Sequence, residues 1–172
     1  MNDEYGSESY QARIYYRGPL RWGGSPRTVK LDITRAETIF LPVKEKQIIH
    51  QYSDHTNFDN SEIPCYSLEV VIAEKIRAIA GQRRFAVSRD LYDINSLETN
   101  GVDINAVKKI LPEKFNIRGL DFHRIDINSI EIRRAEYELD WDRRLNYLIT
   151  NNYSEFESVW ANILDLVKKL SS

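Results

Sequence analysis

Cysteine, glycine and proline are scarce in this 172-residue chain, and each shortage excludes a class of protein. Cys65 is the only cysteine, so the chain can form no internal disulfide and no metal site built from several cysteines. With 7 glycines and 5 prolines, the sequence shows no low-complexity segment or repeat. No apolar run has the length of a membrane span, and the polar, acidic start is unlike a signal peptide. A cytoplasmic protein without a membrane contact is therefore expected.

Two segments lack acidic residues, although the whole chain carries a formal net charge of −2. They are residues 11–31 and residues 75–89. The basic residues in them are Arg13, Arg17, Arg21, Arg27 and Lys30, and Lys75, Arg77, Arg83, Arg84 and Arg89. Local positive charge in an acidic chain favours a phosphate-binding face. Ordinary solvated charge is the alternative, and composition does not decide between them.

Alternating apolar and polar residues predict two strands, at residues 10–17 and 28–33, joined by a turn-rich connection. In the second strand the residues expected on the buried face are Val29, Leu31 and Ile33. Asp32 is then on the polar face, because successive side chains of a strand point to opposite sides.

A third extended segment is predicted at residues 38–43, followed by a hairpin around residues 44–45. In the first connection, Trp22 lies beside two glycines and is interpreted either as a hydrophobic plug or as a stacking platform for a base. The three histidines, His50, His55 and His123, do not have the spacing of metal ligands.

Residues 67–81 have the spacing of an amphipathic helix, which Ser67 can cap and Gly81 is expected to end. Its apolar stripe consists of Leu68, Ile72, Ile76 and Ile79. Lys75 directly precedes Ile76 and is expected at the edge of that stripe.

A second helix is predicted between Ser88, as a possible cap, and the pair Asn100–Gly101. Its expected core residues are Leu91, Ile94 and Leu97. Asp90 and Asp93 are three residues apart and therefore share a face.

Three further helices are predicted: one that Asp103 caps and Pro112 stops, one at residues 128–149, and one at residues 154–170. The inward residues expected in the last two are Ile132, Ala135, Leu139 and Leu145, then Phe156, Trp160, Ile163, Leu164 and Val167. Strands followed by helices indicate an α+β fold. We expect a strand-rich part at residues 1–66 and a helical part at residues 67–172.

Asp32, Lys75 and Asp90 are the candidates for phosphate chemistry. Nucleotidyl transfer needs carboxylates that hold Mg²⁺ and cations that take up charge in the transition state. Asp32 is a candidate metal ligand, Lys75 can contact a triphosphate, and Asp90 can orient Lys75 or activate the attacking hydroxyl. Each also has a structural interpretation: a solvated strand residue, a snorkelling lysine, and an acid that the helix dipole favours.

The run LEVVIAEKIRAIAGQRRFAVSRDLYDINSL resembles the nucleotidyltransferase toxins of the AbiEii/AbiGii family, the toxin half of type IV toxin–antitoxin systems. In that family a helix of the form LEE-aEKlrAl is followed by R..RDlyDl..L. The segments IYYRGPLRWGG, TVKLDI and ETIFLPV, and later WDRRLNYLI and FESVWANIL, also resemble the family pattern. The resemblance covers roughly residues 14–170.

The resemblance implies a partial nucleotidyltransferase fold, with a mixed sheet flanked by helices and then a helical domain. By position it implies that Asp32 is a carboxylate of the metal site, that Lys75 binds phosphate, and that Asp90 is the aspartate of the R-D pair. The residues matched with less definite roles, or expected beside the nucleotide, are Arg83, Arg84, Arg89 and Asp93. It also implies an NTP and Mg²⁺, tRNA as an acceptor, and a separate antitoxin protein as partner.

The family pattern begins with a Gly-Ser and a pair of aspartates that residues 1–10 do not supply. The chain thus corresponds to roughly the later two-thirds of that pattern: a fragment, an independently encoded portion or a degenerate member. We expect weak or absent catalysis by the chain alone, and an exposed strand edge that could support a homodimer. A non-catalytic module that binds nucleotide, RNA or the antitoxin is the alternative, and a structural remnant is a third interpretation.

Overall fold

The structure is a computed structural model, and it describes residues 9–17, 24–34, 38–49, 61–122, 125, 127–145 and 154–171. The chain divides into two compact units, Met1–Ile39 and Phe40–Ser172. Four strands precede residue 66 and the described helices follow it, so the α+β class is confirmed. Trp22 and the three histidines lie outside the described residues. The predicted division into parts at residues 66 and 67 stays a prediction.

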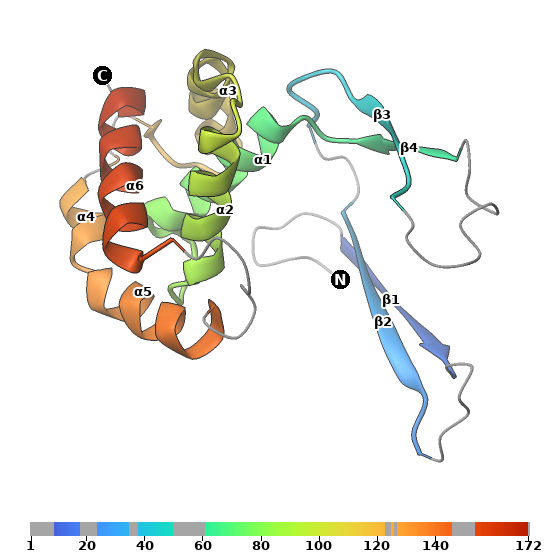
Figure 1. The fold of residues 1–172 in the computed structure, drawn as a ribbon. Coiled ribbons are helices and arrows are strands. Elements are labelled where there is room, and N and C mark those ends of the chain that lie inside the picture. Colours follow the sequence, from blue (N-terminus) through green and yellow to red (C-terminus); the bar gives the residue numbers. More distant parts are fainter. Residues whose placement is uncertain are drawn as a thin grey trace. The chain divides into compact units, whose positions relative to one another are not determined.

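The first unit contains one antiparallel strand pair, β1 (Ser9–Tyr16) and β2 (Arg27–Thr34), in blue in Figure 1. Ile14 is opposite Val29 and Gln11 is opposite Asp32. Directly opposed residues project to the same side of a sheet. One side therefore carries the apolar residues Tyr10, Ala12, Ile14, Tyr16, Val29, Leu31 and Ile33, and the other side carries Asp32.

The apolar side of this pair is exposed, contrary to our expectation. Val29, Leu31 and Ile33 are 45%, 39% and 53% exposed. The alternation predicted the strand and its two sides correctly, but burial also requires a layer that packs on the apolar side. Within the described part of the first unit, β1 and β2 are the elements available, and both contribute to that side.

The second unit begins with a short antiparallel pair, β3 (Lys44–Gln47) and β4 (Glu62–Cys65). The predicted hairpin around residues 44–45 is wrong, since Lys44 and Glu45 lie inside β3 and pair with Cys65 and Pro64. Residues 38–43 are described but form no strand. The partner of β3 is thus distant in sequence, which a local alternation pattern cannot reveal.

The helical core begins with α1 (Leu68–Arg77), which continues as a π-helix, η2 (Ala78–Gln82). Gly81 lies inside η2, which ends at Gln82, so the prediction that Gly81 ends the helix is wrong. Leu68 is 50% exposed and is not part of the buried stripe, although Ile72, Ile76 and Ile79 are. A residue in the first helical turn has fewer neighbours than one in the middle, which explains the exception.

Two helices of expected position follow, α2 (Ser88–Thr99) and α3 (Ile104–Asn116). The prediction that Ser88 caps α2 is wrong, because Val87 occupies the N-cap position and Ser88 is the first helical residue. Asp103 caps α3 as predicted, accepting hydrogen bonds from the backbone N–H groups of Asn105 and Ala106. The prediction that Pro112 stops this helix is wrong, because α3 runs through it. Burial of Leu111 and Phe115 on either side compensates for the backbone hydrogen bond that a proline lacks.

The single helix predicted at residues 128–149 is wrong as well. The structure has α4 (Ile127–Glu131), α5 (Arg134–Asp140) and a π-helix, η4 (Trp141–Leu145), while residues 146–153 lie outside the description. A turn at residues 132–133 separates α4 from α5 and shifts the helical phase. Of the four inward candidates, Ile132, Ala135 and Leu139 are therefore exposed and only Leu145 is buried. The buried residues of this region are Ile130, Tyr137, Trp141 and Leu145.

The core of the second unit is formed around α2, which packs against α1, α5, η4 and the last helix, α6 (Phe156–Ser171; Figure 1). Leu91 and Ile94 of α2 are fully buried. Trp141 contacts Tyr92 and Phe156 edge to face, at centroid distances of 6.3 and 5.6 Å. α6 buries most of its predicted apolar residues, with Leu164 partly buried. Among the described helices none is both long and apolar enough to cross a membrane.

Candidate phosphate-binding site

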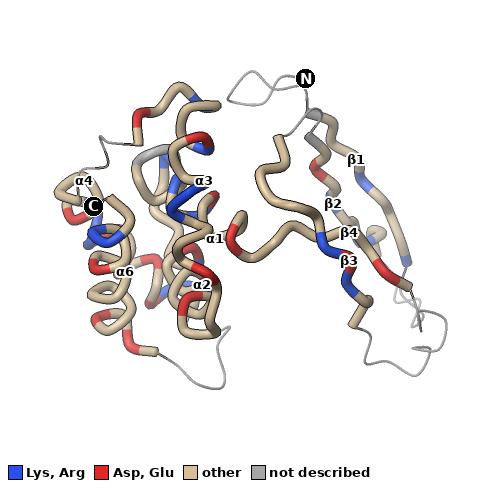
Figure 2. The backbone as a smooth tube through the Cα atoms, turned by 90° about the horizontal axis from the view of Figure 1, so that it is seen from above, with Lys and Arg blue, Asp and Glu red and all other residues tan. Residues whose placement is uncertain are grey.

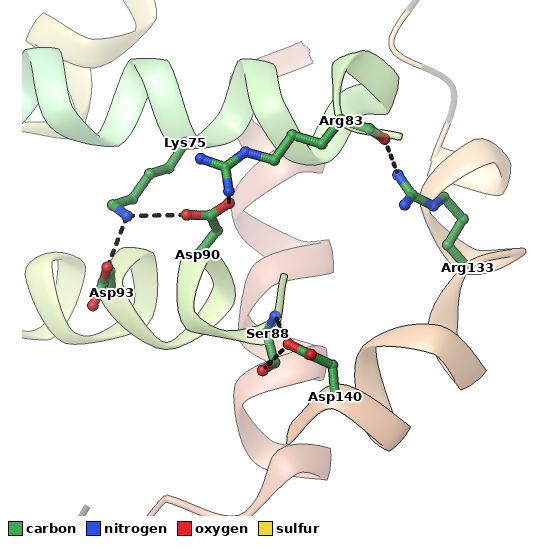
Figure 3. Close-up of polar contacts among 7 residues, drawn as sticks. All are labelled: Lys75, Arg83, Ser88, Asp90, Asp93, Arg133 and Asp140. Atoms are coloured by element: carbon green, nitrogen blue, oxygen red, sulfur yellow. Dashed lines mark hydrogen bonds and ion pairs between the residues drawn. The ribbon is translucent and has the colours of Figure 1, made fainter. Parts of the chain in front are cut away.

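Lys75 on α1 faces two carboxylates on α2 (Figure 3). Its Nζ lies 3.1 Å from Oδ1 of Asp90 and 2.7 Å from Oδ2 of Asp93. The three-residue spacing of the aspartates puts both on the side of α2 that faces α1, as predicted. Lys75 is 18% exposed at the edge of the α1 core stripe, so its ammonium group remains close to solvent.

Arg83 approaches the same cluster from the end of η2 (Figure 3). Its Nη1 lies 3.1 Å from Oδ2 of Asp90, the oxygen that Lys75 does not contact. The wider turn of η2 carries the chain from α1 to this position, and the backbone N–H of Arg83 donates to the carbonyl of Ala78. π-Helical turns are frequent at functional sites because they redirect a side chain without ending the helix.

Asp90 is the buried centre of this cluster, with only 1% of its side chain exposed. A buried carboxylate needs charged or hydrogen-bonding partners, and Asp90 has a cation on each oxygen. An ammonium has three N–H donors and a guanidinium has five. Lys75 directs two of its donors to aspartates and Arg83 is 43% exposed, so both can still donate to a phosphate oxygen.

The remaining predicted site residues are Asp32, Arg84 and Arg89. Asp32 is in the first unit, 61% exposed, with its Oδ2 3.3 Å from Nζ of Lys30. Arg84 is exposed on the connection after η2, with its guanidinium 5.3 Å from the ring centroid of Phe85. Arg89 is exposed in the first turn of α2. The structure thus brings together Lys75, Arg83, Asp90 and Asp93 from the predicted set.

The described residues do not fit a complete metal site. No three histidine, cysteine, aspartate or glutamate residues in the described ranges converge on a point where an ion could be held. Asp32 supplies a single carboxylate with an ammonium beside it, while Asp90 and Asp93 are bound to Lys75. Carboxylates that are already neutralised by cations are poor ligands for Mg²⁺.

Tyr137 of α5 lies close enough to this cluster to be influenced by its charges. It is 1% exposed. Burial raises the pKa of its phenol to about 12, with smaller and opposing effects from the charges of Arg133, Asp90 and Arg83. Its hydroxyl is therefore neutral at physiological pH and places no further charge beside Asp90.

The comparison with protein families decides the identity of the chain. A family model described as "Nucleotidyl transferase AbiEii toxin, Type IV TA system" matches residues 4–162. The chain belongs to the AbiEii family. The recognition based on the run from α1 to α2 is thereby confirmed, and membership implies an antitoxin partner. Comparison with curated proteins and with solved structures found no match.

Two further residues contact the segments that carry this AbiEii-family site, and the sequence did not predict them. Asp140, the last residue of α5, accepts hydrogen bonds from Ser88, and Arg133 donates to the carbonyl of Arg83. The only local signal is that Arg133, Tyr137 and Asp140 are spaced four and three residues apart, as residues on one helix face are.

Proposed function

We propose that this AbiEii-family chain is a nucleotidyltransferase toxin component that transfers NMP from Mg²⁺-bound NTP to an acceptor such as tRNA. The main support is the cluster in which Lys75 and Arg83 share the buried carboxylate of Asp90. Asp90 holds both cations in place, and Asp93 balances their remaining charge. The N–H donors that Lys75 and Arg83 do not direct to these aspartates can contact the oxygens of a triphosphate.

The distances favour a division of roles within the site. Lys75 and Arg83 contact the phosphates of the nucleotide, with Arg84 and Arg89 as further cations on the surrounding surface. An acceptor hydroxyl attacks the α-phosphorus and loses its proton to water, the anhydride bond between the α- and β-phosphates breaks, and pyrophosphate leaves. Asp90 has both oxygens occupied by cations, so we assign it the orientation of Lys75 rather than the abstraction of a proton.

The metal in this proposal enters as part of the Mg²⁺–NTP substrate. Asp32 is our candidate for a protein ligand to it, on the basis of its position in the family pattern. Because the described residues assemble no set of three ligands, we propose that the chain alone catalyses transfer weakly or not at all. We further propose that it works in the cytoplasm.

A non-catalytic module that binds nucleotide, RNA or the antitoxin is a second candidate function. The observation that favours it is that two cations meet at Asp90, whereas no three possible metal ligands among the described residues come together. As a module that binds nucleotide or RNA, this candidate requires the same phosphate contacts as the first, and differs only in the absence of transfer.

Calorimetry with each NTP in the presence of Mg²⁺ tests the phosphate contact, with Lys75→Ala beside the parent. We expect the parent to bind and Lys75→Ala to lose at least about tenfold in affinity, since a charge-assisted contact of this kind contributes about 1.5–3 kcal/mol. Lys169→Ala is the matched control, because Lys169 is an exposed lysine in an ion pair on α6. Thermal unfolding of each variant establishes that it is folded at the temperature of the titration.

The results separate the candidate functions. Equal affinities of the parent and Lys75→Ala would refute the transferase and the module that binds nucleotide or RNA, because both place the phosphates at Lys75. If the parent binds, transfer of label from NTP to tRNA would exclude the non-catalytic module.

A further inference from the structure

The helix that carries Asp90 begins without a capping side chain of its own. Val87 occupies the N-cap position of α2 and makes no side-chain cap hydrogen bond. Valine is among the poorest N-cap residues, because it offers no oxygen to the free N–H groups of the first turn. The beginning of α2 is therefore not determined by its local sequence.

Asp140 supplies the missing cap from the end of α5 (Figure 3). Its Oδ2 accepts a hydrogen bond of 2.9 Å from the backbone N–H of Ser88 and one of 2.7 Å from Ser88 Oγ. Ser88 is 1% exposed and Asp140 is 15% exposed, so these bonds are shielded from water. A carboxylate at a helix N-terminus is further stabilised by the helix dipole.

The position of this cap controls where Asp90 lies. Asp90 is two residues after Ser88, in the same first turn, and its backbone N–H donates to the carbonyl of Val87 at 3.0 Å. If the turn frays, the carboxylate of Asp90 moves away from Lys75 and Arg83. Asp140 thus acts on the site through backbone geometry, without touching Lys75.

The other end of α5 holds the second cation of the site. Arg133, at the N-cap of α5, donates from Nη1 to the carbonyl of Arg83 at 3.2 Å (Figure 3). Tyr137 lies between these two contacts, with the guanidinium of Arg133 5.6 Å from its ring centroid. α5 therefore contacts both ends of the connection between Arg83 and Ser88: Arg133 binds Arg83, and Asp140 binds Ser88.

We propose that Asp140 is a positioning residue for the Lys75–Asp90 site, and that α5 is the element that holds the two halves of the site together. Arg133 has the corresponding role for Arg83. As a statement about nucleotide binding, the inference rests on the proposed function. As a statement about geometry, it can be tested without a nucleotide.

Two variants of Asp140 distinguish its effects. Asp140→Ala removes the acceptor of both Ser88 bonds, whereas Asp140→Asn keeps an acceptor oxygen and removes the charge. We expect Asp140→Ala to bind Mg²⁺–ATP about tenfold more weakly than the parent, and Asp140→Asn to remain within about threefold of it. Asp165→Ala is the matched control, since it removes an exposed carboxylate that pairs with Lys169 on α6.

The affinities are measured at a temperature where every variant is folded. A purely stabilising cap would lower the unfolding temperature of Asp140→Ala and leave the affinity of the folded protein unchanged. That result would overturn the proposal.

A second readout uses no nucleotide and keeps the inference separate from the proposed function. In the parent, the two ion pairs of Lys75 should protect its amine from acylation. We expect Asp140→Ala to raise the acylation rate of Lys75 relative to Lys169, with faster hydrogen exchange at the Asp90 amide. If the parent binds no NTP but both changes occur, the proposed function fails and the positioning role stands. If neither changes, the positioning role fails.

Discussion

Glu74 and Lys75 are neighbours in the sequence, yet they contact different helices. Lys75 contacts α2, whereas Glu74 accepts hydrogen bonds from Lys114 of α3 and from Arg77. Lys114 is only 4% exposed, and its ammonium lies 4.7 Å from the ring centroid of Phe40. The Glu74–Lys114 pair thus fixes the helix that carries Lys75 against α3. Its contribution to stability should depend on pH.

The stability of the chain in acid should depend on Glu74. Burial alone would raise the pKa of Glu74, but the hydrogen bonds and charges of Lys114 and Arg77 outweigh it, so the pKa is below its ordinary value of 4.5. A lowered folded-state pKa adds stability that is complete above pH 4.5 and is lost as the pH falls further. Denaturant unfolding between neutral and acidic pH should show this loss in the parent and a flatter profile in Glu74→Gln.

Glu74→Gln should also cost about 2 kcal/mol at neutral pH, because it leaves the buried ammonium of Lys114 without a carboxylate. Asp165→Asn, which alters an exposed pair, should leave the free energy of unfolding unchanged. Parallel pH profiles for the parent and Glu74→Gln would contradict the assignment.

Tyr137 should make stability depend on pH in the alkaline range, where the loss occurs as the pH rises rather than falls. Because burial raises the pKa of its phenol from 10.0 to about 12, the unfolded chain loses this proton at a lower pH than the folded one. The free energy of unfolding should therefore fall as the pH rises from 10 to about 12. Tyr137→Phe should show a smaller fall over that interval in denaturant unfolding, and an identical fall would argue against a buried neutral phenol.

At this scale the sequence identified one part of the site and missed another. Lys75, Arg83 and Asp90 lie within one short run, where helical spacing alone brings a lysine to the edge of a core stripe. Asp140 is 52 residues from its partner Ser88, and Arg133 is 50 residues from Arg83. Contacts at such separations depend on how helices pack, and that information is not contained in any local pattern.

Among the elements, α3 has the clearest boundary that the sequence determines. Asp103 accepts hydrogen bonds of 2.9 and 3.2 Å from two backbone N–H groups in the first turn. These are groups that no intrahelical carbonyl can satisfy. The cap is local, so the sequence was sufficient to predict it.

Removing this cap should have a moderate and chemically specific effect. We expect Asp103→Ala to lower the free energy of unfolding by about 1 kcal/mol and Asp103→Asn to lower it by only a few tenths. Denaturant unfolding of the three proteins measures both values. An equal loss in the two variants would point to a role of the charge rather than of the hydrogen bonds.

The end of a helix proved harder to predict than its beginning. Pro112 predicted a stop within α3, but the buried residues around it keep the helix intact. The opposite error occurred in residues 128–149, where the turn at 132–133 interrupts a continuous helical pattern. Since one turn changes which face is buried, the apolar pattern then placed Ile132 and Leu139 on the wrong side.

For the molecule as a whole, charged residues are spread along the helices, whereas exposed apolar residues gather on the β1–β2 pair. Acidic and basic segments are interleaved along the helices in Figure 2, and many form ion pairs, such as Lys169 with Asp165. The β1–β2 pair instead has an exposed side on which apolar residues predominate, with Arg27 opposite Tyr16 at its end. Apolar surface of this kind is typical of a surface that another chain covers.

We therefore expect the chain to self-associate through the apolar side of β1–β2, whereas the sequence suggested a homodimer through an exposed strand edge. Sedimentation velocity at increasing protein concentration should show a growing fraction of dimer. Leu31→Lys should reduce it, because it places a charge on the apolar side. Thr28→Lys adds the same charge to the opposite side and should have little effect. A monomeric profile of the parent at high concentration would exclude this association.

The attachment of α5 to Ser88 also has a consequence for the order in which the protein is made. A ribosome that has reached Asp93 has already synthesised every residue that pairs with Lys75. Asp140, which holds Ser88 in place, is not yet translated at that point. Since domains fold as they emerge during synthesis, a nascent toxin would have its cations and aspartates long before it has their final arrangement. The complete arrangement of the site can form only when the later helices have left the ribosome.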